Sequence, residues 1–173
     1  MATSLQNLSS YDETNIPDGS TFSIGIVVSD WNSHITHSLF QACHETLLKN
    51  GVKDFNITSI QVPGAFELPV AAKMLMGAKS FDAVICLGCV IKGETKHDEY
   101  INNAVAHGLT NLSIISGKPV VFGVLTPDTE QQSIDRAGGV HGNKGDEAAV
   151  TALRMIDLQK QLVTRKSSIG FSS

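Results

Sequence analysis

The chain has 173 residues, of which 42% are hydrophobic and 17% are charged, and this suits one globular domain better than two. Its formal net charge of −4 and the absence of a long basic run argue against a nucleic-acid-binding surface. No apolar stretch approaches the roughly 20 residues of a membrane-spanning helix, so no membrane partner is expected.

The first 20 residues contain neither an apolar signal segment nor an arginine. They therefore resemble neither a secretory signal nor a typical transit peptide, and a cytoplasmic location is expected. We interpret residues 1–20 as a flexible N-terminal arm.

The three cysteines are an odd number, which argues against a disulfide framework. Cys86 and Cys89 match the C-x-x-C pattern of redox proteins. A redox pair needs its nucleophilic thiol at a helix N-terminus, whereas Cys86 falls inside a predicted strand. We therefore interpret these cysteines as small buried side chains.

The first predicted strand is the β-branched run from Phe22 to Val28. It ends at a polar segment around the only tryptophan, Trp31. A helix follows, for which Asn32 or Ser33 would be the N-terminal cap, and Gly51 ends it.

Three histidines of this helix, His34, His37 and His44, are spaced three and seven residues apart. Histidines in such an arrangement can bind a metal ion, but no carboxylate or cysteine completes a site. We interpret them as part of a solvated helix face and expect no metal.

The second predicted strand, Phe55 to Val62, alternates apolar and polar residues, as strands near a sheet edge do. A glycine-containing turn ends it, and a second amphipathic helix follows. In one interpretation Gly64 only permits a tight turn and Phe66 covers the core. In the other, the backbone N–H groups of Ala65 and Phe66 face a ligand. This segment alone does not decide between them.

The central predicted strand, Ala83 to Leu87, is a continuous apolar run, typical of a strand buried on both faces of a parallel sheet. It breaks at Gly88, and a polar loop leads to a helix that begins near Asp98. Ligands of open α/β sheets lie at such strand ends, and a helix N-terminus there favours phosphate. Because His97 can exchange protons near neutral pH, we expect a ligand site here.

The last third of the chain continues the alternation of strands and helices. Val120 to Leu125 is a fourth buried strand. Thr126 or Asp128 would cap a short helix over Thr129 to Ala137, and after a glycine-rich connection the last helix starts at Asp146.

At least four strands therefore alternate with helices, which predicts an α/β fold with a parallel sheet, helices on both faces and right-handed crossovers. No repeat or low-complexity linker indicates a second domain, so we expect one domain at 21–160 and a C-terminal tail at 161–173. Trp31, the turn 63–67 and the loop 88–97 would then meet at one sheet edge. An aromatic ring, turn N–H groups and a histidine suit a flat heterocycle with an anion.

Several segments carry a more specific pattern. They are VPGAFELP at Val62 to Pro69, the GETKH core within Gly88 to Tyr100, FGVLT at Phe122 to Thr126, RAG at Arg136 to Gly138, and GNKG at Gly142 to Gly145. In this order, over about residues 20 to 160, the sequence resembles the 6,7-dimethyl-8-ribityllumazine synthase family.

This resemblance implies a flavodoxin-like three-layer sandwich with a four-stranded parallel sheet. It also implies homopentamers and, in some members, an icosahedral shell of sixty chains built from twelve pentamers. The implied activity is that of a transferase in the penultimate step of riboflavin biosynthesis. There 5-amino-6-(D-ribitylamino)uracil condenses with 3,4-dihydroxy-2-butanone 4-phosphate, and phosphate and water leave without a metal or organic cofactor. Riboflavin synthase is a further partner that we expect.

The resemblance also assigns roles to single residues. Trp31 would stack on the pyrimidine ring, and Glu67 would accept hydrogen bonds from the ribityl hydroxyls. His97 would transfer protons, and Arg136 would bind the departing phosphate, so these two are the expected catalytic residues. The full expected set for ribitylaminouracil is Trp31, Ala65, Phe66, Glu67, Cys89, Val90, Ile91, Phe122 and Lys144; the set for phosphate is Gly93, Glu94, Thr95 and Arg136.

Three of these residues would come from the neighbouring subunit: Phe122, Arg136 and Lys144. Phe122 would close the pocket, and Lys144 would contact the substrate or pair with Asp146 or Glu147. In the phosphate loop we expect contacts from backbone N–H groups and the Thr95 hydroxyl. The Glu94 side chain would point away, because a carboxylate repels an anion.

Two positions depart from the family pattern. Asp98 follows the expected catalytic histidine where many members have an aromatic residue; its charge could favour protonated His97, or it could cap the helix, which we favour. Val140 replaces a lysine of several members and leaves Arg136 with less help, for which His141 would be a weak substitute. The loop between Gly138 and Gly145 is short, which favours the sixty-subunit shell.

Two other classes of function share parts of this pattern. A non-enzymatic flavodoxin-like module that binds FMN or riboflavin would share the fold and the Trp31 stack, but it would not need His97 together with Arg136. A purely structural shell subunit would assemble without turnover.

Overall fold

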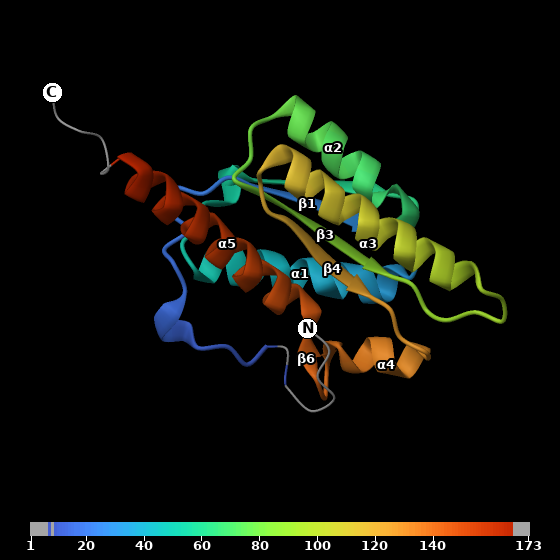
Figure 1. The fold of residues 1–173 in the computed structure, drawn as a ribbon. Helices are drawn as coiled ribbons and strands as arrows, with labels where there is room; N and C mark the ends of the chain where they lie inside the picture. The colour runs from blue at the N-terminus through green and yellow to red at the C-terminus, as the bar shows by residue number, and fades with distance from the viewer. Residues whose placement is uncertain (1–6, 8, 168–173) are drawn as a thin grey trace, which may run out of the picture.

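A four-stranded parallel sheet forms the centre of the fold in the computed structural model, which describes residue 7 and residues 9–167 (Figure 1). The strand order is β2-β1-β3-β4, and each neighbouring pair is parallel. The prediction of an α/β fold with four parallel strands is therefore confirmed. The strands are β1 (Ile24–Ser29), β2 (Ile57–Val62), β3 (Ala83–Cys89) and β4 (Val120–Leu125).

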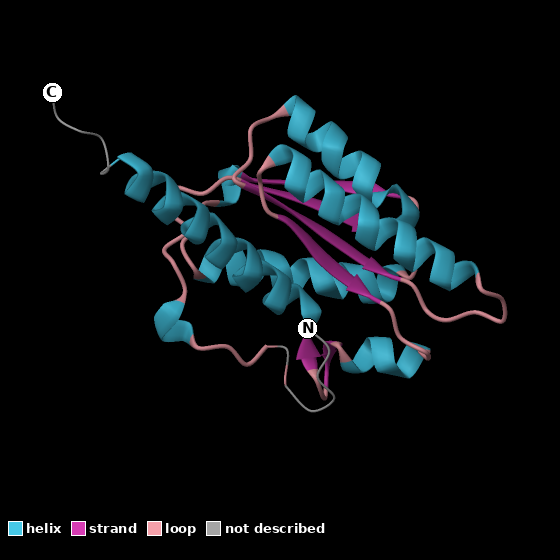
Figure 2. Ribbon diagram, viewed as in Figure 1, coloured by secondary structure: helices cyan, strands magenta, loops and turns pink. Residues whose placement is uncertain are grey.

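Helices cover both faces of this sheet, as the predicted three-layer sandwich requires (Figure 2). Ile24, Ile26 and Val28 of β1 belong to a core shared with α1 and α5, whereas Val27 belongs to a second core shared with α2 and α3. This alternation follows from the two-residue period of a strand. The four helices are α1 (Ser33–Lys49), α2 (Leu68–Ala78), α3 (His97–Ser116) and α5 (Lys144–Ser167).

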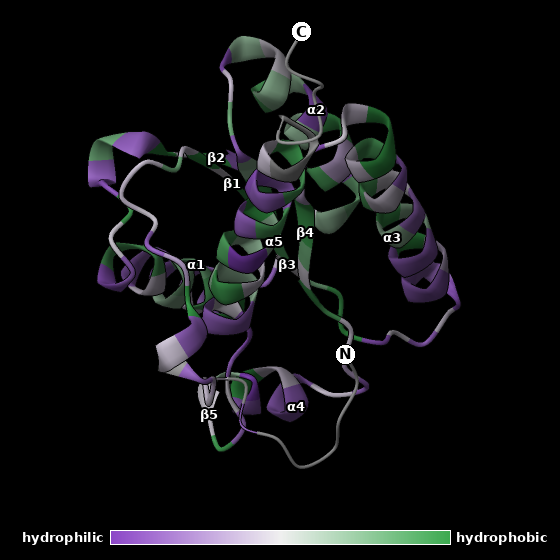
Figure 3. Cartoon of the chain, turned by 60° about the vertical axis from the view of Figure 1, so that its left-hand side comes forward, coloured by the Kyte–Doolittle hydropathy of each residue, from purple (hydrophilic) through white to green (hydrophobic). Residues whose placement is uncertain are grey.

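Hydrophobic residues are concentrated on the strands, while the helices alternate between hydrophobic and hydrophilic residues (Figure 3). β1 and β3 are buried along their whole length, which explains their continuous apolar sequences. Among the described residues, no helix has both the length and the apolar composition needed to cross a membrane.

A small unit separates β4 from α5. It consists of α4 (Glu130–Asp135) and an antiparallel hairpin of β5 (Ala137–Gly139) and β6 (Gly142–Asn143). The sequence predicted a longer helix that continued to Ala137 and was capped by Thr126 or Asp128, and this was wrong. Thr129 is the cap, because its Oγ1 accepts a hydrogen bond from the Gln132 N–H at 3.3 Å. The helix is short because Ala137 pairs with Asn143.

The predicted break of the central strand at Gly88 was also wrong. β3 continues to Cys89, which lies opposite Leu125 of β4. Gly88 is used for close packing, since a Cβ there would lie 3.1 Å from Leu68 Cδ1 and 3.2 Å from Ser29 Oγ.

Other predicted boundaries shift by one or two residues. β1 begins at Ile24 instead of Phe22, and β2 begins at Ile57 because Asp54–Asn56 forms a 3₁₀ turn. α3 begins at His97, and α5 begins at Lys144 instead of Asp146. Further 3₁₀ turns lie at Glu13–Asn15 and Ala65–Glu67.

Parts of the predicted N-terminal arm and C-terminal tail lie outside the described residues, namely 1–6, 8 and 168–173. The described part of the arm contacts the domain: the Gly19 N–H donates to the Asn50 carbonyl at 2.8 Å, and Ser9 Oγ accepts from the Asn143 N–H at 2.8 Å. α5 continues past Lys160, where the tail was predicted to begin, to Ser167.

The start of α5 packs so closely on α1 that only glycine fits at position 145. A Cβ at Gly145 would collide with the backbone carbonyl oxygen of Leu39. We expect Gly145→Ala to lower the free energy of unfolding by about 1–3 kcal/mol, because the two helices must separate. The matched control is Gly77→Ala on α2, where a Cβ meets no atom within 4 Å. This control should stabilise the protein by about 0.5 kcal/mol. Urea unfolding at a fixed protein concentration compares the two; equal midpoints would contradict the packing argument.

Candidate functional site

A cavity of about 760 Å³ lies at the carboxyl ends of β1, β2 and β3. Three segments far apart in the sequence line it: the turn after β1, the turn after β2 and the segment from Cys89 to Ile101. This is the sheet edge at which the sequence predicted a ligand site. The predicted site residues that line it are Trp31, Ala65, Phe66, Glu67, Cys89, Val90, Ile91, Gly93, Thr95 and His97.

The turn after β1 presents the Trp31 side chain to solvent. Its backbone is fixed by β2, because the Asp30 N–H donates to the Val62 carbonyl at 2.8 Å and the Trp31 N–H donates to the Pro63 carbonyl at 3.0 Å. Trp31 is 73% exposed, so its indole ring has a free face on which a flat heterocycle can stack.

The turn after β2 leaves Phe66 exposed instead of covering the core. Gly64 has φ −146°, an extended conformation that any residue adopts, so no tight turn requires a glycine there. A Cβ at this position would instead lie 3.1 Å from Glu67 Oε2. The interpretation in which Gly64 only permits a tight turn and Phe66 covers the core is therefore wrong, and the one in which the N–H groups of Ala65 and Phe66 face a ligand stays a prediction.

The segment after β3 leads from the sheet to the N-terminus of α3. The Val90 N–H donates to the Leu125 carbonyl at 2.8 Å, which holds the start of the segment against β4. Thr95 Oγ1 accepts from the His97 N–H at 3.4 Å. His97 itself is exposed at the first position of a 20-residue helix, whose dipole favours an anion nearby.

Asp98 does not cap α3 as we favoured from the sequence. The residue in the N-cap position is Lys96, whose side chain makes no capping bond. Asp98 lies in the first turn, and its Oδ1 accepts from the Gly93 N–H at a long 3.5 Å. A phosphate bound to the Gly93 N–H would therefore replace a weak bond to this carboxylate.

Four of the predicted site residues do not line this cavity. The Glu94 side chain is exposed beside it. Phe122 and Lys144 line a second cavity of about 590 Å³ along β4 and α5, where Lys144 Nζ pairs with Glu147 Oε1 at 2.7 Å. Arg136 follows α4, and its Nη1 donates to the Gln132 carbonyl at 3.1 Å. The last three are the residues expected to serve a neighbouring subunit.

Sequence reasoning missed several lining residues. Tyr100 and Ile101 follow His97 at spacings of three and four, so they share its helix face, and this spacing could have identified them. Asn32 also lines the cavity, although its position before a helix indicated only a cap.

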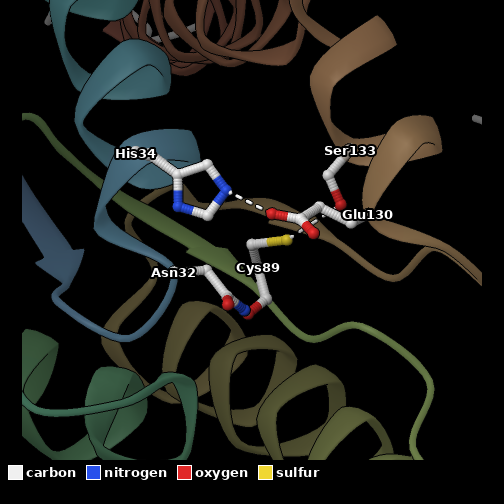
Figure 4. Close-up of polar contacts among 5 residues, drawn as sticks. All are labelled: Asn32, His34, Cys89, Glu130 and Ser133. Atoms are coloured by element: carbon white, nitrogen blue, oxygen red, sulfur yellow. Dashed lines mark hydrogen bonds and ion pairs between the residues drawn. The ribbon is translucent and has the colours of Figure 1, made fainter.

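The cysteines are free and buried, as their interpretation as small buried side chains predicted. Burial raises the pKa of the Cys43, Cys86 and Cys89 thiols. Cys89 Sγ lies 3.4 Å from the Ser133 hydroxyl, which links β3 to α4 (Figure 4). Thiols with a raised pKa are poor nucleophiles at neutral pH, which argues against a redox pair.

We expect none of the three thiols to react with Ellman's reagent in the native protein at pH 8, because they are both buried and protonated. In urea all three should react within minutes, and the absorbance of the released thionitrobenzoate measures this. Rapid reaction of one thiol before unfolding would contradict the burial of the cysteines.

The three histidines of α1 contact three different carboxylates. His34 Nε2 lies 2.9 Å from Glu130 Oε1 (Figure 4), and His44 Nε2 lies 2.9 Å from Asp54 Oδ1. His37 Nε2 lies 3.5 Å from Asp30 Oδ1. In the described part of the chain, no three histidine, cysteine or acidic side chains gather in a way that could hold a metal ion.

Known proteins of one family are similar to this chain over most of its length. A profile of the family described as 6,7-dimethyl-8-ribityllumazine synthase matches residues 21–160. A protein of that name from Parabacteroides distasonis is 53% identical over 157 residues, which cover 91% of this chain and 98% of the relative. The 6,7-dimethyl-8-ribityllumazine synthase of Cytophaga hutchinsonii is 53% identical over 90% of this chain and 98% of its own length. The one from Flavobacterium psychrophilum is 48% identical over 99% of this chain and 88% of its own length. The chain therefore belongs to the 6,7-dimethyl-8-ribityllumazine synthase family.

Proposed function

We propose that this protein condenses 5-amino-6-(D-ribitylamino)uracil with 3,4-dihydroxy-2-butanone 4-phosphate to form 6,7-dimethyl-8-ribityllumazine, phosphate and water. It is a transferase of riboflavin biosynthesis. The observation that carries this proposal is the cavity at the strand ends, which brings an exposed indole, the turn 63–67 and His97 into one site. Family membership and the high identity to proteins of this name support the same reaction.

In this site the pyrimidine stacks on Trp31, and the ribityl chain lies along Ala65, Phe66 and Glu67. The Glu67 carboxylate accepts hydrogen bonds from the ribityl hydroxyls. Backbone groups of Cys89, Val90 and Ile91, which line the same cavity, complete the pyrimidine pocket. Support for this placement comes from the position of all these residues around one cavity.

The phosphate lies against the loop before α3. Backbone N–H groups at Gly93, Glu94 and Thr95, the Thr95 hydroxyl and the positive end of the α3 dipole favour an anion there. The Thr95 hydroxyl can still donate a hydrogen bond, because its oxygen is the acceptor in its contact with His97.

The reaction begins when the amine of the pyrimidine attacks the ketone, which gives a carbinolamine and then an imine. Phosphate then departs, and the chain turns to close the second ring. Each stage moves a proton, which His97 takes and returns. The cavity also holds the two substrates together, which accounts for much of the remaining acceleration.

Arg136, Phe122 and Lys144 complete the site of an adjacent subunit in a homopentamer. In support, all three lie outside the cavity of their own chain, and Phe122 is 36% exposed beside a second cavity. Arg136 donates one bond to a backbone carbonyl, so the rest of its guanidinium can bind the phosphate of a neighbour.

The condensation is tested by mixing the purified protein with both substrates and following the fluorescence of the lumazine product. The expected result is a product that needs both substrates and accumulates over many turnovers. A flavin-binding module would bind riboflavin but form no lumazine, and a structural shell subunit would assemble without turnover. Either outcome would contradict the proposal.

We also propose that the pentamers form a sixty-subunit shell, because the connection between Gly138 and Gly145 is short. Analytical ultracentrifugation is expected to show a single large species and no separate pentamer. A pentamer peak alone would contradict the shell but not the reaction.

We also propose three further properties of the protein. The chain is divided into an arm (1–20), a domain (21–160) and a tail (161–173), the protein is cytoplasmic, and riboflavin synthase is its partner. Co-purification with riboflavin synthase from cells that express both proteins tests the last of them.

A further inference from the structure

Asn32 connects the turn that carries Trp31 to the end of β3 (Figure 4). Its Nδ2 donates to the Cys89 carbonyl oxygen at 3.1 Å. Its backbone has φ 61° and ψ 46°, and in the described part of the chain no other non-glycine residue has a positive φ. Asparagine tolerates this left-handed conformation better than most residues.

This arrangement is unusual for an asparagine directly before a helix. Such a residue normally has an extended backbone, and its side chain accepts a hydrogen bond from an N–H of the first turn. Asn32 occupies the N-cap position of α1, yet its side chain makes no capping bond. The side chain instead points away from the helix and binds a neighbouring strand.

The turn is thereby held from two sides. Backbone N–H groups of Asp30 and Trp31 bind it to the end of β2, and the Asn32 amide binds it to the end of β3. β1 lies between these two strands in the sheet. The position of Trp31 is thus fixed relative to both other segments that line the cavity.

We propose that Asn32 is a positioning residue for the pyrimidine substrate. It holds the Trp31 turn at a fixed spacing from the Cys89–Ile91 segment. Both sides of the pyrimidine pocket are therefore correctly placed before the substrate binds. This inference rests on the proposed function, because it takes that ring to be the ligand of Trp31. No contact of Asn32 itself with the reacting atoms is needed.

Two substitutions distinguish the contribution of the Asn32 side chain from that of its backbone conformation. Asn32→Asp keeps the shape and the tolerance of a positive φ, but it replaces the N–H donor with an oxygen that repels the Cys89 carbonyl. Asn32→Gly keeps the backbone conformation and removes the side chain. The matched control is Asn111→Asp on the exposed surface of α3, far along the helix from the cavity.

Because Trp31 is the only tryptophan, fluorescence excited at a wavelength that tyrosine does not absorb reports on this turn alone. The probe is ribitylaminouracil added without the second substrate, so that no turnover occurs. We expect it to quench the wild-type emission, and half-quenching of Asn32→Asp should need a concentration about tenfold higher or more. Asn32→Gly should show a smaller shift in the same direction, and Asn111→Asp should match the wild type.

Steady-state kinetics provide the second readout. In Asn32→Asp the KM for ribitylaminouracil should rise about tenfold, while the KM for the butanone phosphate should change by less than about twofold, because Asn32 does not bind the phosphate loop. If Asn32 had only a structural role, the substitution would raise the KM values of both substrates alike. This result would overturn the inference.

The fluorescence titration distinguishes the positioning role of Asn32 from the binding of the pyrimidine at Trp31. If the substrate quenches the wild type and both Asn32 variants equally, the positioning role is refuted and the proposed function stands. If it leaves the wild-type emission unchanged, Trp31 does not bind the pyrimidine, and both the positioning role and the assigned stack on Trp31 are refuted, while lumazine formation still decides on the reaction. Should Asn32→Asp not assemble, Asn32→Gly decides between these results.

Discussion

Replacing His97 with alanine should lower kcat by about 10²–10⁴-fold and still leave measurable turnover. The loss follows from the proton transfers of carbinolamine formation, imine formation and ring closure, which water performs less well than a positioned imidazole. The residual rate follows from the cavity, which still holds both substrates together. KM should change little, because the role proposed for His97 is proton transfer and the other lining residues are assigned to substrate binding.

The measurement is a steady-state assay of lumazine fluorescence with each substrate varied in turn. His107→Ala is the matched control, since His107 is also exposed on α3 but does not line the cavity. This control should keep the wild-type kcat. An unchanged kcat in His97→Ala, or complete inactivity in a folded and assembled variant, would contradict the proposed role.

Replacing Arg136 with alanine should lower kcat/KM for the butanone phosphate by about 10–10²-fold, the effect of losing hydrogen bonds from a charged donor to phosphate. The KM for ribitylaminouracil should stay within about twofold of the wild-type value, because the guanidinium is assigned to the anion alone. Arg136→Lys should recover part of the loss, since lysine keeps the charge without the planar fork.

The fold should tolerate this substitution. Within its own chain the Arg136 guanidinium donates to the Gln132 carbonyl, one bond at the end of a six-residue helix. The matched control is Arg154→Ala on α5, whose guanidinium donates at 3.5 Å to the Asp12 carbonyl. Urea midpoints of both variants should lie close to the wild type. Equal effects of the two substitutions on the phosphate substrate would contradict the role of Arg136.

Sequence patterns identified the sheet because β3 and β4 are continuous apolar runs and β2 alternates apolar and polar residues, as an edge strand does. β3 is buried along its whole length, so its sequence is apolar throughout and has no alternation to misread, and β4 is almost as apolar although Phe122 is exposed. Strand ends were harder to predict. Gly88 indicated a break, yet its missing side chain serves the contact with Leu68 and Ser29. A glycine that ends a strand and one that permits close packing look the same in a sequence.

The β5–β6 hairpin could not be predicted from its residues. Ala137 to Gly139 and Gly142 to Asn143 have low strand propensity, and tertiary contacts determine their pairing. The Ala137 carbonyl accepts a hydrogen bond from Ser38 Oγ of α1 at 2.6 Å, a contact between residues far apart in the sequence. Local patterns contain no information about such a contact.

The candidate site was predicted in part for a physical reason. Trp31, the turn 63–67 and His97 each follow a predicted strand, and parallel strands bring their carboxyl ends to one edge. The contact of Asn32 with β3 was not predicted, because an asparagine before a helix ordinarily caps it. Its bond to the Cys89 carbonyl depends on the neighbouring positions of β1 and β3.

The central claim is that each site takes His97 from one chain and Arg136 from the next, and co-expression of the two alanine variants tests it most directly. In a mixed assembly of equal parts, about a quarter of the shared sites would contain both intact residues. The specific activity of the mixture should then reach about a quarter of the wild-type value, far above either variant alone. If each chain built a complete site by itself, no site in the mixture would be intact. Activity no higher than the average of the two variants would therefore contradict the shared site.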